Sequence, residues 1–279
     1  MANEVTVTTA ANFIPEIWSS KILDVVKASL VLSPRVTRYD SMVYGKGKGD
    51  IIRIPTVTEI GTTAKTASTD VVPVANTEGK VDLTVGSHFY AAVDVEDIVK
   101  IQGIGELMGR YTDGIGYGVA KKMDATLAAL ATGFSQTTGT AGTDVTDAVI
   151  LRSIQYLDDA NAPLTNRHFA IKPAVKADIL ALDKFVLYQN ANRDRVNTGE
   201  LGEVYGVEVS ATTQITTTAG SPDTINNMMF HKDAIGMAVA RDIRVQSDYE
   251  LRGLSTLLVA DALWGVTETR NTFGVWVKA

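Results

Sequence analysis

Residues 98–132 read IVKIQGIGELMGRYTDGIGYGVAKKMDATLAALAT. Their apolar side chains recur at steps of three and four, which is the period of one helix face. A helix from Ile104 to Thr132 would rise roughly 43 Å at about 1.5 Å per residue, well beyond the three turns of an average helix. The sequence therefore predicts a long helix whose apolar stripe packs against other elements.

The same stretch is rich in glycine, with Gly105, Gly109, Gly114, Gly116 and Gly118 inside the expected helix. Each interior glycine costs about 0.5–1 kcal/mol relative to alanine, so packing must stabilise such a helix. The pairs Gly105/Gly109 and Gly114/Gly118 are spaced i,i+4, which leaves a flat surface where another backbone can come close. Two interpretations follow: a long core helix, or a spine that carries separate lobes on either side.

Composition bounds the classes of protein that this chain can represent. It has 279 residues, no cysteine and a formal net charge of −6. Disulfides, thiolate metal sites and cysteine nucleophiles are excluded, and the acidic balance argues against a dedicated nucleic-acid binder. The first residues lack the basic and apolar regions of a signal peptide, and no run of eighteen apolar residues predicts a membrane span.

The N-terminal third predicts arms around a short strand. Residues 1–13 are polar, and residues 14–33 form an amphipathic pattern that Pro34 ends. This helix would pack either on its own domain or on a neighbouring subunit. The Gly-Lys repeat of residues 45–49 is a turn that lacks the spacing of a phosphate-binding loop. We expect its two lysines to face solvent or the carboxylates of a partner.

Residues 58–79 are small, polar and aperiodic, and strands with Ile52 and Ile54 before them and Val81, Leu83 and Val85 after them flank the segment. A structureless segment of that length is unusual inside a compact domain and indicates a protruding arm or a functional loop. A two-stranded arm is marginally stable by itself, so a neighbour would supply the missing burial.

The rest of the chain predicts an α+β lobe followed by long strands. After a turn at residues 133–144, Thr146 can cap a helix that ends before Pro163, and residues 168–180 read as strand, proline and helix. Residues 206–215 are expected as a strand and residues 216–227 as a loop. Residues 237–246 and 254–266 predict two further strands, and the long helix is the natural cover for the second.

No pattern in the sequence indicates catalysis, a metal or a cofactor. His88, His168 and His231 lie far apart, outside any metal-ligand spacing. Asp94 and Glu96 would share a strand face, where they favour the following helix dipole, bind a cation or pair with a partner's Lys or Arg. A competing hypothesis makes these two carboxylates an enzyme site, which loss of turnover in Asp94→Asn with unchanged assembly would support.

The order of segments resembles the major capsid proteins of tailed bacteriophages, whose fold encapsulins share. The resemblance rests on FIPEIWSSKILDVVKASLV (13–31), GDIIRIP (49–55), VDLTVGSHFYAAVDVED (81–97), the long helix, HFAIKPAVKADIL (168–180), AVARDIRVQSDYELRGLSTLLVADALWGV (238–266) and TFGVWV (272–277). It implies an N-terminal arm, an extended β-hairpin called the E-loop, a peripheral domain with a spine helix and long strands, and an axial α+β domain.

The resemblance also implies domain boundaries and partners. The expected parts are the N-terminal arm (1–34), the E-loop with its flanking strands (35–93), the peripheral domain (94–140 and 240–268) and the axial domain (141–239, with 269–279 as its tail). Expected partners are other copies in hexamers and pentamers, a separate scaffolding protein, a portal, a decoration protein and non-specifically packaged DNA.

The resulting expectation is a non-enzymatic, self-assembling major capsid protein of a virion, assembled in the host cytoplasm around double-stranded DNA. An encapsulin-type nanocompartment shell is the alternative within the same fold. The residues expected to contact neighbouring subunits are Trp18, Ile22, Lys46, Lys48, Lys65, Asp94 and Glu96.

Overall fold

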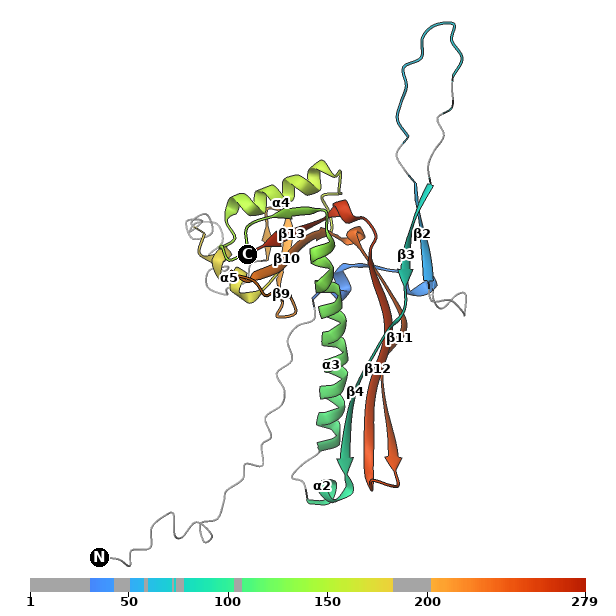
Figure 1. Ribbon diagram of the computed structural model, residues 1–279, viewed down its shortest axis with the longest axis vertical. Helices are drawn as coiled ribbons and strands as arrows, with labels where there is room; N and C mark the ends of the chain where they lie inside the picture. The colour runs from blue at the N-terminus through green and yellow to red at the C-terminus, as the bar shows by residue number, and fades with distance from the viewer. Residues whose placement is uncertain are drawn as a thin grey trace, which may run out of the picture.

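The computed structural model describes residues 31–42, 51–57, 60–71, 73, 78–102, 107–182 and 202–279. Over these residues it forms an α+β fold with three sheets (Figure 1). One long sheet runs beside the long helix, a second sheet forms a lobe with shorter helices, and a two-stranded hairpin projects beyond both. The predicted helix at residues 14–33 lies almost wholly outside the described residues.

The long sheet has the strand order β1-β11-β12-β4. Its strands are β1 (Thr37–Arg38), β4 (Ser87–Glu96), β11 (Ile235–Glu250) and β12 (Ser255–Glu268). The helix α3 (Leu107–Ala129) lies along one face of the sheet, which we call the inner face (Figure 1). This arrangement confirms the prediction that the long helix covers the second C-terminal strand.

Apolar side chains at steps of four hold α3 against the inner face. On the helix, Ile115, Val119, Met123 and Leu127 are buried. Alternate residues of β12 face them, and these are also buried: Leu258, Ala260, Ala262 and Trp264. Phe89 of β4 stacks on Trp264 with ring centroids 5.0 Å apart. The buried side chains of β12 recur at every second residue and those of α3 at helical spacing, so the apolar face of the strand packs against the apolar face of the helix.

The ends of three elements differ from the sequence-based expectation. Helix α3 gives way to a 3-10 turn at Leu130–Gly133, and a short helix, α2 (Asp97–Gln102), precedes it. Strand β11 continues to Glu250, and β12 begins one residue after Leu254, whose φ of 48° places it in the turn between these strands. Thr146 occupies the predicted N-cap position of α4 but makes no capping hydrogen bond through its side chain.

The predicted protruding arm is present as a hairpin. Strands β2 (Ile51–Val57) and β3 (Glu78–Thr84) pair antiparallel, and the segment between them extends away from the rest of the molecule (Figure 1). Residues 60–71 are all exposed. Only the base of the hairpin is anchored: Leu83 and Val85 are buried against Ala238 of β11. Within the described part of the chain, residues 60–71 therefore have no packing partner.

The second sheet has the order β5-β13-β10-β6-β8-β7, with β9 paired to β10. Its strands are β5 (Gln136–Thr138), β6 (Arg167–Ile171), β7 (Glu203–Val204), β8 (Val207–Ala211), β9 (Thr217–Thr218), β10 (Thr224–His231) and β13 (Gly274–Lys278). The helices α4 (Asp147–Asp159) and α5 (Pro173–Leu180) belong to the same lobe, and short 3-10 turns occur at Lys232–Ala234 and Asn271–Phe273. The predicted strand–proline–helix of residues 168–180 is confirmed.

The prediction of a loop at residues 216–227 was wrong, because β10 begins at Thr224 and lies in the middle of this sheet. In the sequence, the consecutive asparagines Asn226 and Asn227 interrupt the apolar pattern of this strand. Both are buried, and both have partners: the Asn227 amide donates to the Val277 carbonyl at 3.2 Å and accepts from the Lys172 amide at 2.9 Å. Asn226 donates to two threonine hydroxyls. These bonds offset most of the cost of burying the two amides, although Asn226 Oδ1 is buried without a hydrogen-bond partner.

Residues 31–42 cross from α3 to the long sheet, and one buried carboxylate holds their start. Asp124 of α3 is fully buried and accepts hydrogen bonds from the backbone amides of Val31 at 2.8 Å, Leu32 at 3.3 Å and Ser33 at 3.0 Å. Farther along, Asp40 accepts from the Val239 amide at 2.7 Å. We call the first contact the Asp124 clamp.

Candidate interaction surfaces

The sequence-predicted contact residues are spread over three parts of the chain. Trp18, Ile22, Lys46 and Lys48 lie outside the described residues. Lys65 is exposed in the segment that extends from the hairpin. The role of all these residues in subunit contact stays a prediction.

Asp94 and Glu96 are exposed on the outer face of the long sheet, the face that points away from α3. They share one side of β4, as predicted, since residues two apart on a strand point the same way. The following helix begins at Asp97, so both residues end the strand rather than start the helix. The strand pairing places them in the same rows as two carboxylates of β11, with β12 between, which the sequence did not reveal.

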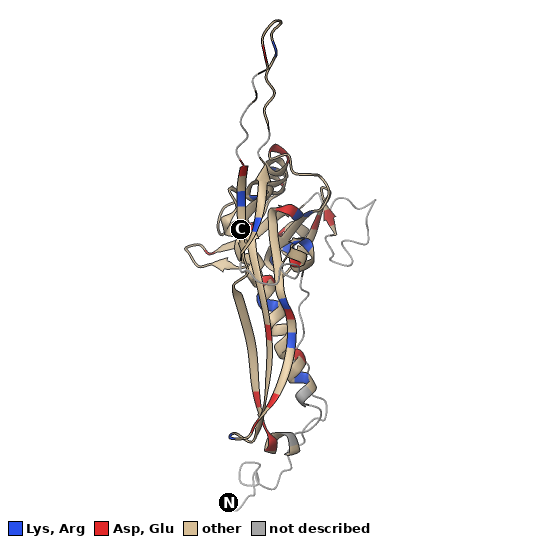
Figure 2. Ribbon diagram, turned by 90° about the vertical axis from the view of Figure 1, so that its right-hand side faces the viewer, with Lys and Arg blue, Asp and Glu red and all other residues tan. Residues whose placement is uncertain are grey.

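The pairing register arranges the outer face in five rows across β11, β12 and β4. The rows are Arg241–Leu263–His88, Arg244–Asp261–Tyr90, Gln246–Val259–Ala92, Asp248–Leu257–Asp94 and Glu250–Ser255–Glu96. The first two rows carry two arginines, one histidine and the carboxylate of Asp261, the middle row is uncharged, and the last two rows each carry two carboxylates. Figure 2 shows the acidic positions gathered at the far end of the long strands. We call this surface the outer face.

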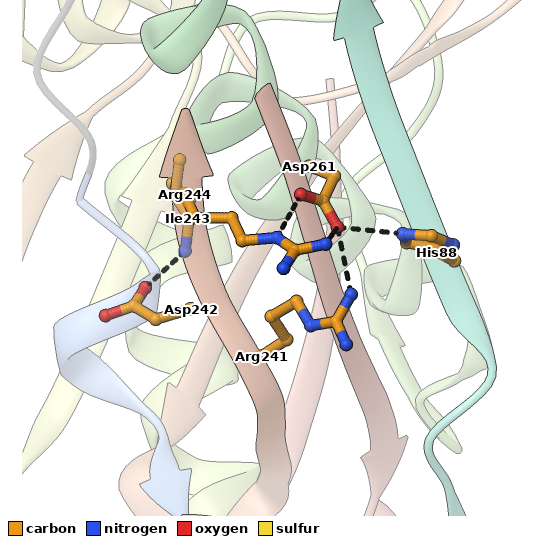
Figure 3. A network of polar contacts seen from close by, with 6 residues as sticks. All are labelled: His88, Arg241, Asp242, Ile243, Arg244 and Asp261. Carbon is orange, nitrogen blue, oxygen red and sulfur yellow. Dashed lines mark hydrogen bonds and ion pairs between the residues drawn. The ribbon is translucent and has the colours of Figure 1, made fainter. Parts of the chain in front are cut away.

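At the basic end, the carboxylate of Asp261 contacts two arginines and one histidine (Figure 3). Arg244 donates through Nε to Asp261 Oδ1 at 2.6 Å and through Nη2 to Oδ2 at 3.3 Å. Arg241 donates through Nη1 to Oδ2 at 3.3 Å, and His88 Nε2 lies 3.1 Å from the same oxygen. The Asp261 side chain is 9% exposed, whereas the side chains of both arginines are nearly half exposed.

The hydrogen bond from Arg244 holds the pKa of Asp261 well below its usual range, and the bonds from His88 and Arg241 act in the same direction. Asp261 therefore stays ionised on the surface of the folded protein. Because two guanidinium groups share this single carboxylate, the cluster keeps a net positive charge toward solvent. Sequence reasoning missed the cluster, although a lone aspartate within the apolar run of residues 257–264 was a signal for it.

A shallow groove of about 530 Å³ lies next to this cluster. Its floor is apolar, with Ala92, Leu257 and Val259 from two strands, and Tyr90 forms part of its wall with its side chain 74% exposed. Asp248 stands at the opposite end from Arg244 and His88. The groove thus combines an apolar centre with charges of opposite sign at its two ends.

A third surface lies at the far end of the long sheet, around α2 and the β11–β12 turn. Five large apolar side chains are exposed there: Ile98, Val99, Ile101, Leu251 and Leu254, the last three at 84%, 79% and 61%. Tyr249 joins the turn to α2 by donating to Asp97 Oδ2 at 2.7 Å, which raises the pKa of the tyrosine. Exposed apolar groups held on an ordered end are typical of contact surfaces.

The second lobe holds the N-terminal segment through an ion-pair cluster. Arg35 pairs with Glu208 of β8, and Glu208 Oε2 lies 3.0 Å from His168 Nδ1 of β6. Burial lowers the pKa of His168, and the nearby Arg35 adds to this effect against the opposing charge of Glu208. The cluster therefore holds a neutral imidazole at neutral pH.

Within the described ranges, no three His, Asp or Glu side chains are placed to hold a metal ion. No helix in the same ranges is both long and apolar enough to cross a membrane.

The chain is similar to known proteins in structure, but searches with its sequence found no match. Neither a protein-family model nor a curated protein matches the sequence. Among solved structures, one from Mycobacterium phage Che8 is 22% identical with a TM-score of 0.80, covering 95% of this chain and 97% of that one.

Two further structures are phage capsids. The capsid structure of the cyanophage P-SCSP1u is 15% identical, with a TM-score of 0.76 and coverage of 96% and 93%. The mature capsid of bacteriophage PhiM1 is 14% identical, with a TM-score of 0.74 and coverage of 95% and 91%. The chain therefore has the tailed-phage capsid fold over nearly its whole length, as the order of its segments had indicated.

Proposed function

We propose that this chain is a major capsid protein, which assembles with copies of itself into the icosahedral shell of a tailed phage. The observation that carries the proposal is the match along nearly the whole of both chains, since it includes both lobes and is not confined to one of them. The matches reported above give the encapsulin alternative no support, and we do not propose it.

The surfaces of the chain support a role in assembly. The segment that extends from the hairpin exposes Ile60 and Val71, and the far end of the long sheet exposes five more large apolar side chains. Isolated hairpins are marginal in water, so a neighbouring copy would complete their burial. Closed shells repeat every such contact around symmetry axes, and repetition makes weak contacts strong together.

The finer parts of the proposal follow from this role. Hexamers and pentamers would build the shell, with a separate scaffolding protein and a portal during assembly in the host cytoplasm, and a decoration protein could add to the outside. The enclosed double-stranded DNA would be contacted without sequence preference. A chain of net charge −6 suits a wall that does not grip phosphate strongly. The proposed role requires no enzymatic step.

A shortened hairpin tests the proposal without disturbing the fold. Val57 and Glu78 are paired in register, so Asn-Gly in place of residues 58–77 closes the hairpin as a two-residue turn. Because residues 60–71 are exposed, we expect an unchanged melting temperature and circular dichroism spectrum. Light scattering should show particles for the full chain and only small species for the shortened one. Particles of equal size and yield from both chains would contradict the role of the hairpin.

A further inference from the structure

Residues 31–36 lie between the two lobes and are held from both sides. The Asp124 clamp holds their start to α3, and Arg35 reaches across to Glu208 of β8. Arg35 also donates through Nη1 to the Val31 carbonyl at 2.7 Å. One guanidinium group therefore braces the start of this segment and joins it to the second lobe.

The carboxylate that Arg35 reaches has a second neighbour. The strand pairing of the second lobe sets Phe230, His168 and Glu208 side by side in one row. The His168 side chain is 12% exposed, and the centroid of its ring lies 5.9 Å from that of Phe230. Its Nδ1 lies 3.0 Å from Glu208 Oε2 but is buried without a hydrogen bond. The imidazole and the carboxylate are therefore close to each other but not aligned.

The contact with Arg35 fixes the carboxylate in this orientation. Arg35 Nη2 bonds Oε1 of Glu208, so the carboxylate cannot turn to face His168 without leaving Arg35. Arg35 is itself incompletely satisfied, because its Nε is buried without a hydrogen-bond partner. Water would hydrate this nitrogen if the side chain swung outward, which lowers the cost of its release.

We infer that Arg35, Glu208 and His168 form an acid-sensitive catch. At neutral pH Glu208 holds Arg35. When His168 takes up a proton, the carboxylate turns to the imidazolium and the Arg35 side chain is released to solvent. The released side chain no longer bonds the Val31 carbonyl, so the 3-10 turn at Ser33–Arg35 loosens. The inference concerns the single subunit and does not depend on the proposed assembly.

The charges around His168 set the direction of the effect. Burial lowers the pKa of His168 below the ordinary 6.5, and Arg35 and His231 lower it further, whereas Glu208 raises it. Release of Arg35 removes one of the effects that lower this pKa and leaves Glu208 in place. The released state therefore binds the proton more tightly, so the catch holds above about pH 6.5 and opens as the pH falls below that value.

Proton NMR of the histidine ring protons tests the coupling in the soluble subunit. The chain has three histidines, and replacement of each by glutamine assigns its signal. Arg35→Gln should raise the pKa of His168, because it removes a cation and lets Glu208 turn to the ring. Arg38→Gln is the matched control. Arg38 lies on the same segment but pairs with Asp40, so its replacement should leave the pKa of His168 unchanged.

Hydrogen exchange at a series of pH values tests the release itself. The Arg35 amide donates to the Leu32 carbonyl at 2.9 Å, so its protection factor reports the turn. If one proton opens the catch, this factor should fall by up to about tenfold for each pH unit below 6.5. His168→Gln cannot take up that proton and should show no such fall, and an equal melting temperature at pH 7.5 verifies that it folds. Glu208→Gln should loosen the turn already at neutral pH.

Two results would overturn the catch. One is a pKa of His168 that Arg35→Gln changes no more than Arg38→Gln does. The other is a protection factor of the Arg35 amide that is constant with pH, or that falls equally in His168→Gln. Both measurements use the subunit before assembly, so shells that form alongside either result would leave the proposed function intact. A working catch in a chain that never forms a shell would support the inference and contradict the proposed function.

Discussion

Replacement of Asp124 by asparagine should destabilise the fold by an amount that the clamp geometry sets. The side chain is fully buried, and its two oxygens accept three backbone amide hydrogens at 2.8, 3.3 and 3.0 Å. In asparagine one of these oxygens becomes an amide that donates. The better orientation turns this amide toward Ser33 and keeps the oxygen that faces Val31 and Leu32.

The change therefore leaves one buried amide without an acceptor and makes two charge-assisted hydrogen bonds neutral. An unsatisfied buried donor costs about 1–3 kcal/mol, and a hydrogen bond to a charged group contributes about 1 kcal/mol more than a neutral one. We expect a loss of roughly 3–5 kcal/mol in the free energy of unfolding. Asp124→Ala removes all three acceptors and should cost more.

Urea denaturation of the soluble subunit measures this loss. Asp159→Asn is the matched control, because Asp159 is exposed at the end of α4 and its replacement should change stability by less than about 0.5 kcal/mol. Hydrogen exchange locates the effect: in the Asp124→Asn variant, the backbone amides of Val31 and Ser33 should lose protection before those of β12. An Asp124→Asn variant as stable as the control would refute the argument that the clamp holds this segment.

Three further changes have expected results. Gly114→Ala and Gly118→Ala should each raise the free energy of unfolding, measured in urea, by about 0.5–1 kcal/mol. The reason is that an added Cβ at either position meets no atom within 4 Å. Destabilisation by either alanine would contradict this, because it would show that the methyl group does meet a neighbour. Burial lowers the pKa of His168 and His231 below the ordinary 6.5, so the unfolded chain takes up protons first as the pH falls. Stability should therefore decline from pH 7.5 to 5.5, and His168→Gln should flatten this dependence in urea melts; an unchanged slope would contradict the assignment. Because the pKa of Asp261 is lowered in the folded protein, stability should fall as the pH drops below 3.8, and Asp261→Asn should remove this loss. Acid titration followed by circular dichroism measures it, and identical acid unfolding of the original and the variant chain would contradict the prediction.

The sequence predicted those parts of the fold that have one strong period. The helix at residues 107–129 was visible because its apolar residues recur at helical spacing without interruption. The hairpin was visible because two alternating strands bound a long polar segment. Strand β10 was missed because Asn226 and Asn227 interrupt its pattern, and only their partners in the folded chain explain why they are tolerated there.

Interaction surfaces were harder to predict, because they depend on register. Asp94 and Glu96 were recognised as sharing a face, but their alignment with Asp248 and Glu250 requires the pairing of three strands. The cluster around Asp261 likewise joins residues separated by up to 173 positions. No local period carries that information, so the five rows of the outer face emerged only from the folded structure.

The central claim is that this chain builds a shell, and microscopy of the purified 279-residue chain tests it most directly. Negative-stain images of the expressed protein, with its scaffolding protein where one is needed, should show closed shells or rings of five or six subunits. A chain that remains a monomer in those images under crowding and with the scaffold present would contradict the claim.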